Sequence, residues 1–223
     1  DPSTAMLNRY YTSEWYAEVR AALQPSGVLA WEMSSSRHYF RPSLIRFNSS
    51  ILSAAASSFP RRALMPGEDT LAVTVGGPDA DLSDDAAEIL GRLRKRRIEA
   101  PYFEAMVADR LDPFNRQFVL DELAKAPPTP RNDDLRPIGY LYNQAVWVGL
   151  YYPDLEEVYV RAADLRLPDL ALPAGVVLAV FLLVGVRPRG RQAYVVLSVV
   201  VTGALGMLLE LVLLLAFQAF RGY

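Results

Sequence analysis

The chain has 223 residues, with 23 lysines and arginines against 25 aspartates and glutamates, and a formal net charge of −2. The absence of cysteine excludes disulfides, zinc–thiolate sites and thiol catalysis, and the single histidine, His38, excludes a metal site built from several imidazoles. Residues 170–223 hold four arginines and one glutamate, so the rest of the chain is acidic. An acidic soluble part argues against nucleic acid as the main partner.

The first thirty-three residues predict half of an α/β unit. Ser13 is the expected N-cap of a helix that continues to Leu23. Residues 25–27, Pro-Ser-Gly, break this helix, and the apolar run 28–33 has the length of a buried strand. Because the chain opens on Asp1 without a methionine or a targeting segment, we expect it to be a piece of a longer protein.

The middle of the chain predicts further alternation of helices and strands, with turns at proline and glycine. The expected helices are 42–59, 86–97, 102–110, 114–125 and 138–150, and the expected strands are 63–65 and 71–75. The two strands are joined by Pro66-Gly67-Glu68-Asp69, which predicts a hairpin.

Two long uncharged runs close the chain. Residues 170–186 contain no charge, and residues 192–220 contain only Glu210. A basic turn, 187–191, separates them, so we expect a transmembrane hairpin, the alternative being two buried core helices. The predicted organisation is a soluble domain at 1–153, a linker at 154–169 and transmembrane helices within 170–223. Arginines are equally numerous on both sides of the hairpin, so they do not decide its orientation.

Several segments together form a pattern that resembles a known family. They are Asp1-Pro2, Leu7-Asn8-Arg9-Tyr10-Tyr11-Thr12, Glu14-Trp15-Tyr16, the turn 23–29, the aromatic segment 140–147 and the span around Gly203, Met207 and Glu210. This pattern resembles the membrane-fused bacterial branch of the spermidine synthase (polyamine aminopropyltransferase) family. The resemblance implies an α/β fold: the C-terminal part of a Rossmann-like (class I methyltransferase-type) domain, followed by a transmembrane α-helical hairpin.

The resemblance also implies a function. The parent protein is expected to transfer an aminopropyl group from decarboxylated S-adenosylmethionine, a donor substrate, to an amine acceptor in polyamine biosynthesis, without a permanently bound cofactor. The glycine-rich loop and the acidic residue that hold the donor are expected upstream of Asp1, so this piece alone is expected to be inactive. The alternative is an inactive synthase-like domain that regulates or accompanies a membrane transporter bundle.

The implied partners are a small-molecule amine such as a polyamine, membrane lipid and other transmembrane helices of the same parent chain, with no nucleic acid. The implied location is the bacterial inner membrane, as a multi-pass protein with its soluble domain in the cytoplasm, where the nucleoside donor is made.

Asp1 is the candidate catalytic residue, since a carboxylate can hold the ammonium group of an amine and accept its proton. The alternative is that Asp1-Pro2 is a simple turn. Residues 63–69 lack the tyrosine that the family carries near this strand pair, which leaves the acceptor amine open. We predict no metal site.

Tyr10 and Tyr11 are candidate substrate-binding residues, because aromatic faces attract cations; the alternative is that they pack against the start of a helix. Glu210, inside the second apolar run, is either a helix-packing residue or a transport or proton site. Tyr140, Tyr142 and Trp147 form either a membrane-interface belt or a packed helix face.

Overall fold

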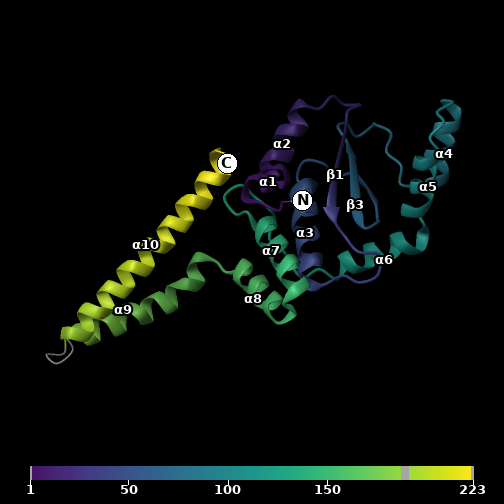
Figure 1. The fold of residues 1–223 in the computed structure, drawn as a ribbon. Coiled ribbons are helices and arrows are strands. Elements are labelled where there is room, and N and C mark those ends of the chain that lie inside the picture. Colours follow the sequence, from purple (N-terminus) through teal and green to yellow (C-terminus); the bar gives the residue numbers. More distant parts are fainter. Residues whose placement is uncertain (1, 187–190, 222–223) are drawn as a thin grey trace. The chain divides into compact units, whose positions relative to one another are not determined.

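The computed structural model describes residues 2–186 and 191–221 and has a mixed α/β architecture with a small three-stranded sheet (Figure 1). The chain divides into two compact units, Asp1–Ala163 and Asp164–Tyr223. Each unit is described by itself below.

The sheet of the first unit has the strand order β1-β3-β2. Its strands are β1 (Val28–Ser34), β2 (Arg62–Met65) and β3 (Asp69–Val75), and β3 runs antiparallel to both neighbours. The predicted hairpin is therefore confirmed as the β2–β3 pair. Because β1 and β2 both oppose β3, they run parallel to each other, and α3 (Pro42–Ala56) makes the crossover between them.

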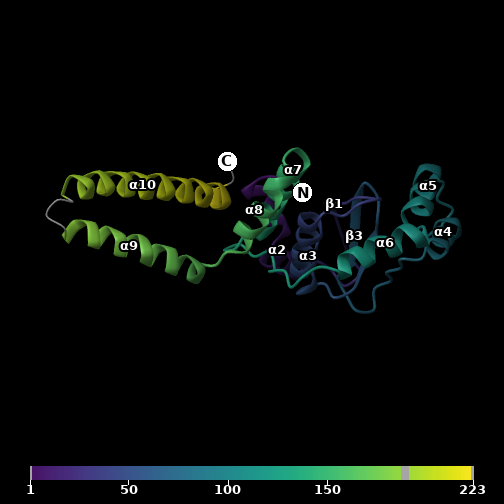
Figure 2. The same ribbon diagram turned by 90° about the horizontal axis from the view of Figure 1, so that it is seen from below.

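One face of the sheet carries the larger core. Trp31 and Met33 of β1 and Ala72 of β3 point to this face, where α2 (Ser13–Ala22), α3 and α7 (Ile138–Tyr151) cover them. Figures 1 and 2 show these helices on the same side of the sheet. The largest fully buried side chains of this core are Tyr16, Phe47, Ile51, Phe59 and Tyr142.

The opposite face carries a smaller core. Met65 of β2 packs there with Val107 and Leu111, against α4 (Ala86–Lys95) and α5 (Pro101–Arg110). The sheet thus has helices on both faces, as α/β folds require.

The N-terminal segment and the last helices complete the first unit. They are α1 (Ala5–Asn8), the 3₁₀ turn η1 (Arg9–Tyr11), α6 (Pro113–Ala124) and α8 (Pro153–Asp164). Thr12, rather than Ser13, caps α2, its Oγ1 accepting from the Trp15 amide at 3.4 Å. The Ser13 hydroxyl instead hydrogen-bonds to Asp133.

The expected linker 154–169 is largely helical, since α8 occupies its first part and the compact unit extends to Ala163. Val160 and Ala163 are buried, and Glu156 accepts from the Ser43 amide at 3.2 Å and the Ser43 hydroxyl at 2.6 Å. A carboxylate suits this position, because the first amides of a helix such as α3 lack intrahelical acceptors.

The second unit contains the 3₁₀ turn η2 (Leu167–Leu170), α9 (Ala171–Val186) and α10 (Arg191–Arg221). Within α10, the 21 residues Tyr194–Leu214 are long and apolar enough to span a membrane, with a mean hydropathy of 2.3, while the apolar stretch Ala171–Leu183 is shorter. The rings of Phe181 and Tyr194 lie 4.6 Å apart, so the two helices contact each other. Residues 187–190 of the predicted basic turn lie outside the described residues.

Candidate functional site at the carboxyl end of β1

Polar groups from four parts of the chain meet where β1 ends. The Tyr11 hydroxyl of η1 donates to the Glu32 carbonyl at 3.4 Å, and Asn48 Nδ2 of α3 donates to the Ser34 carbonyl at 3.0 Å. Beside them, Thr70 of β3 donates to the Ser35 hydroxyl at 2.8 Å. The segment 9–11 and the strand, which are separate in the sequence, therefore form one site.

Asn132 fixes the N-terminal segment against α7. Its side-chain Nδ2 donates to the Tyr11 carbonyl at 2.9 Å, and its Oδ1 accepts from the Gly139 amide at 2.9 Å. Its own carbonyl accepts from the Ser13 amide at 3.0 Å. This fully buried amide has a partner for each of its polar ends, so its role is structural.

Three other buried asparagines differ from Asn132. Asn8, Asn48 and Asn143, which we call the asparagine seam, are each at most 2% exposed, and the Oδ1 atom of each has no hydrogen-bond partner in the part of the chain that the structure describes. A buried acceptor without a donor lowers the stability of the fold by about 1–3 kcal/mol. Three such acceptors in one domain therefore require an explanation.

The packing of α3 on α7 brings the asparagine seam together. A Cβ atom added at Gly139 would lie 2.9 Å from both Ile51 Cδ1 and Asn8 Oδ1. At the other end of this antiparallel pair, Arg41 donates to the Gly149 carbonyl. Asn143 lies one turn from Gly139 on the same face of α7, and Asn48 lies one turn from Ile51 on α3.

Burial changes the acidity of the tyrosines beside the site. Burial, and then the nearby Glu32 carboxylate, raise the pKa of Tyr11. Burial raises the pKa of Tyr16 further, with Tyr11 adding to the rise and Arg62 opposing it. Both phenols therefore stay neutral at physiological pH, as hydrogen-bonding and packing groups rather than bases.

The predicted site residues lie in different places. Asp1 is outside the described residues. Tyr11 lies in the site, whereas Tyr10 is exposed and meets Trp15 edge-on at 6.0 Å, the packing at the start of a helix that was its alternative. Glu210 is an exposed residue of α10 and belongs to the second unit.

The aromatic segment on α7 is divided between two environments. Tyr142 is fully buried in the core, which agrees with a packed helix face, and Trp147 is exposed, which agrees with an interface belt. The packed helix face therefore holds for Tyr142, and the interface belt stays a prediction for Trp147.

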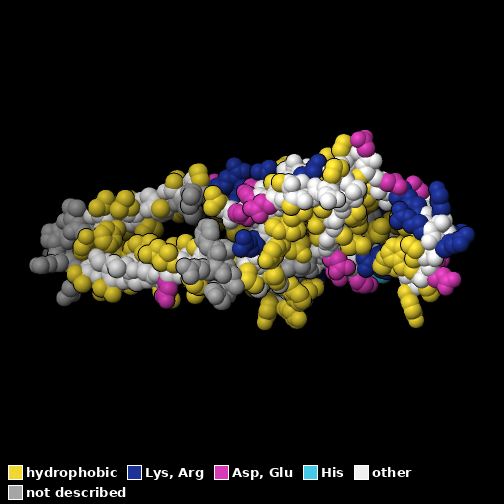
Figure 3. Space-filling model, turned by 90° about the horizontal axis from the view of Figure 1, so that it is seen from above, with side chains coloured by type: hydrophobic (Ala, Val, Ile, Leu, Met, Phe, Trp, Pro, Cys, Tyr) yellow, Lys and Arg dark blue, Asp and Glu magenta, His cyan; other side chains and the backbone are white. Residues whose placement is uncertain are grey.

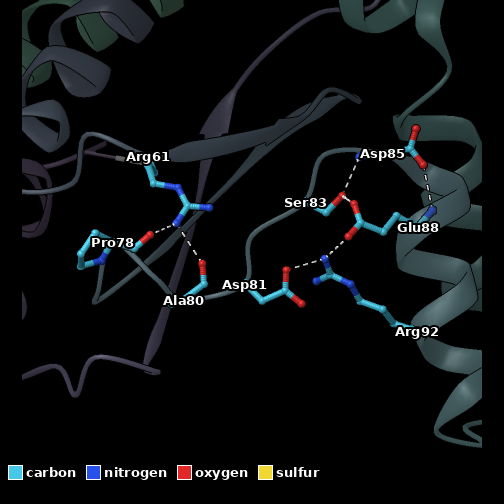
Figure 4. A network of polar contacts seen from close by, with 8 residues as sticks. All are labelled: Arg61, Pro78, Ala80, Asp81, Ser83, Asp85, Glu88 and Arg92. Atoms are coloured by element: carbon cyan, nitrogen blue, oxygen red, sulfur yellow. Dashed lines mark hydrogen bonds and ion pairs between the residues drawn. The ribbon is translucent and has the colours of Figure 1, made fainter.

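The charged end of the first unit, at α4 and α5, shows only surface pairing. Arg92 pairs with Asp81 and Glu88, and Arg61 donates to the Ala80 carbonyl at 2.9 Å, which holds the segment before α4 in place (Figure 4). Basic side chains gather over this end of the molecule (Figure 3).

A hollow of about 490 Å³ lies between α4 and α5. Both basic and acidic residues line it: Arg94, Arg97, Glu99 and Glu104. The described residues contain no cluster of His, Asp and Glu that could hold a metal ion.

Sequence reasoning missed the asparagine seam. Asparagine is a poor helix former, and Asn48 and Asn143 both stand inside helices, within apolar stretches. Asparagines inside apolar helices were the sequence signal that could have revealed the seam.

Comparison of the chain with family models, with curated proteins and with solved structures finds no match in any of the three.

Proposed function

We propose that the chain holds the C-terminal part of a spermidine synthase-like domain and two transmembrane helices of a membrane-anchored protein, which transfers an aminopropyl group from decarboxylated S-adenosylmethionine to an amine acceptor. The observation that carries the proposal is the meeting of the N-terminal segment with the carboxyl end of β1, through Tyr11 and Glu32. In open α/β sheets, ligands bind outside the carboxyl ends of the strands. The position of Tyr11 beside the carboxyl end of β1 supports the proposal.

The topology of the sheet supports the finer fold assignment, the C-terminal part of a Rossmann-like domain. β1, α3 and β2 form a crossover between parallel strands, with helices on both faces of the sheet. Such crossovers also occur in doubly wound folds, although here the antiparallel strand β3 lies between the two parallel strands.

We propose that the acceptor amine binds at the asparagine seam. An ammonium group has three N–H donors and no acceptor, and carboxamide oxygens without donors are its complement. Carboxamides also avoid the cost of burying an unpaired carboxylate.

The chemical step requires one proton transfer and one substitution. Asp1 is our candidate for the carboxylate that holds the acceptor ammonium. The ammonium loses a proton to a second carboxylate, expected upstream of Asp1, and the amine nitrogen attacks the aminopropyl carbon next to the sulfonium of the donor. A C–N bond forms as the C–S bond breaks, and the electron pair of that bond stays on sulfur, which leaves as a neutral thioether nucleoside. The donor-binding residues are expected upstream of Asp1.

The test uses the protein expressed from its complete gene, with radiolabelled decarboxylated S-adenosylmethionine and a panel of amines. We expect aminopropyl transfer, and we expect Asp1→Asn to abolish it while circular dichroism stays unchanged. Unchanged turnover of Asp1→Asn would remove Asp1 from the mechanism. No transfer to any amine would favour the inactive synthase-like domain that accompanies a transporter bundle.

The second unit supports membrane anchoring. Tyr194–Leu214 is long and apolar enough to cross a bilayer, and hydrophobic side chains follow both α9 and α10 (Figure 3). We propose that the two helices form a two-span hairpin in the bacterial inner membrane, with the soluble domain in the cytoplasm and with further helices of the parent chain beside them.

Glu210 fits helix association in this proposal. α10 has a shallow hollow of about 330 Å³ lined by Ser198, Val199, Thr202 and Gly203, which gives another helix room to approach. We expect Glu210→Leu to weaken helix association in detergent, measured by cross-linking, without changing the soluble domain. Unaltered assembly of that variant would contradict this role.

A further inference from the structure

Helix α8 has two apolar faces, which are adjacent around its axis. Its inner face packs on the first unit through Val160 and Ala163, which are buried. The adjacent face shows Leu155, Val158 and Tyr159, which follow the i, i+3, i+4 spacing of a single helix face and are all exposed. A surface helix normally turns charged and polar residues outward, so this second face calls for a partner.

Aromatic residues at the end of α7 and at the turn into α8 are exposed as well. Trp147 and Tyr151 lie one turn apart on α7, and Tyr152 follows at the turn into α8. Tyr151 is 72% exposed and Tyr152 is 64% exposed. We define the outer face as Trp147, Tyr151, Tyr152, Leu155, Val158 and Tyr159.

We propose that the outer face docks on the lipid bilayer at the level of the headgroups. It combines tryptophan and tyrosine with aliphatic residues, and this composition is typical of membrane–water interfaces, where one end of an aromatic ring is apolar and the other is wet. An amphipathic helix at such an interface buries its apolar face by about 5–10 Å.

The chain itself indicates a bilayer as the occupant. Only residues 165–170 separate α8 from the apolar helix α9, and six residues span at most about 21 Å. If α9 and α10 enter a membrane, as proposed above, the end of α8 is held close to its surface. Tethering at this range replaces a bimolecular encounter by a high effective concentration.

The charges beside the outer face favour an apolar rather than an electrostatic attachment. Asp154 and Glu157 flank it, and the basic residue Arg161 is already paired with Glu157 at 2.6 Å. The face therefore carries no basic excess with which to bind anionic headgroups, in contrast to polybasic membrane segments. Docking should depend on the presence of a bilayer and little on its anionic lipid content.

The test exploits the absence of cysteine from the chain. The full chain is reconstituted in phosphatidylcholine bilayers with one nitroxide-labelled cysteine at a time, and relaxation by oxygen, which concentrates in lipid, is compared with relaxation by a water-soluble nickel chelate. Val158→Cys reports on the outer face, Tyr102→Cys on an exposed aromatic position of α5, and Val199→Cys on an exposed position of α10; the native side chains are 58%, 92% and 67% exposed.

We expect the Val158→Cys label to be relaxed several-fold more by oxygen than by the chelate, and the Tyr102→Cys label to show the reverse. Adding phosphatidylglycerol should leave both ratios unchanged. A water-like ratio at Val158→Cys, or a lipid-like ratio that arises only with phosphatidylglycerol, would overturn the proposal. Spin–spin broadening at Val158→Cys that grows with protein density would overturn it too, because it would assign the face to a second copy of the chain.

The Val199→Cys label separates this inference from the proposed membrane insertion. A lipid-like ratio at Val199→Cys with a water-like ratio at Val158→Cys would leave the insertion intact and overturn the docking. A water-like ratio at Val199→Cys would overturn the insertion, and with it the tether on which the docking proposal rests.

Discussion

The inner and outer sides of α7 and α8 reverse the usual distribution of polar and apolar residues. The inner side of α7 buries Asn143, whose Oδ1 has no hydrogen-bond partner in the described residues, and Gly139 of the same helix lies close to the likewise unpartnered Oδ1 of Asn8. The outer side exposes aromatic and aliphatic residues, among them Trp147 and Val158. One pair of helices thus carries two departures from the pattern that a soluble domain prefers.

The stability of the fold explains neither the buried asparagines nor the exposed apolar residues. Buried acceptors without donors destabilise a fold, and exposed apolar faces add nothing to it in water. Departures of this kind are expected at functional sites, where another requirement outweighs local consistency. We assign the inner departure to the acceptor amine and the outer one to the bilayer, and the following changes separate structural from functional residues.

The largest loss of stability is expected from a substitution in the apolar core beneath these helices. Phe47 is fully buried on α3, and Phe47→Ala should lower the free energy of unfolding by about 3–5 kcal/mol, because it removes a ring and leaves a cavity. Trp147→Ala removes a larger but exposed side chain, and it should leave the stability in detergent nearly unchanged. Denaturant titration of both variants, followed by circular dichroism, makes the comparison. An equal loss for Trp147→Ala would place Trp147 in a structural contact.

A smaller effect should distinguish the two kinds of buried asparagine. Asn132→Leu removes the hydrogen bonds to the Gly139 amide and the Tyr11 carbonyl. It should lower the free energy of unfolding by about 1–3 kcal/mol. Asn143→Leu removes an oxygen that has no partner in the described residues, so it should leave the unliganded protein as stable or more stable. It should also weaken the rise in melting temperature that we expect spermidine to produce. 1,8-octanediol, a neutral chain of similar length, is the control ligand. Destabilisation by Asn143→Leu in the absence of amine would make that residue structural.

Much of the secondary structure could be predicted from local signals. Pro42, Pro101 and Pro113 begin their helices, where a missing amide hydrogen costs nothing, and the turn of 66–68 joins β2 to β3 as expected. Helix α8 was harder, because its acidic residues resemble a solvated linker. Glu156 is acidic for a different reason: it binds the first turn of α3, and no local pattern reveals a partner more than a hundred residues away.

The site was predictable only in part. The position of Tyr11 at the carboxyl end of β1 follows from the predicted helix–turn–strand order, whereas the asparagine seam depends on how α3 packs against α7. Its register is set by contacts such as Ile51 with Gly139, which are tertiary. The Rossmann-like domain and the acceptor amine stay predictions, because local sequence patterns predict neither the complete topology of a domain nor its ligand.

The third expected effect is a loss of stability at alkaline pH that originates on the inner side. Burial raises the pKa of Tyr16 well above its usual value of 10.0, so the unfolded state ionises first. Stability from this group is therefore complete below pH 10 and falls as pH rises towards the folded-state pKa, by about 1.4 kcal/mol per pH unit. Tyr16→Phe should remove that dependence, and because the Tyr16 hydroxyl is buried without a partner in the described residues, it should not lower stability at neutral pH. Denaturant midpoints between pH 8 and pH 11, compared for both proteins, measure the difference. A dependence that persists unchanged in Tyr16→Phe would mean that the alkaline transition belongs to other groups, and the neutral-pH comparison would then remain as the separate test of the unpartnered hydroxyl.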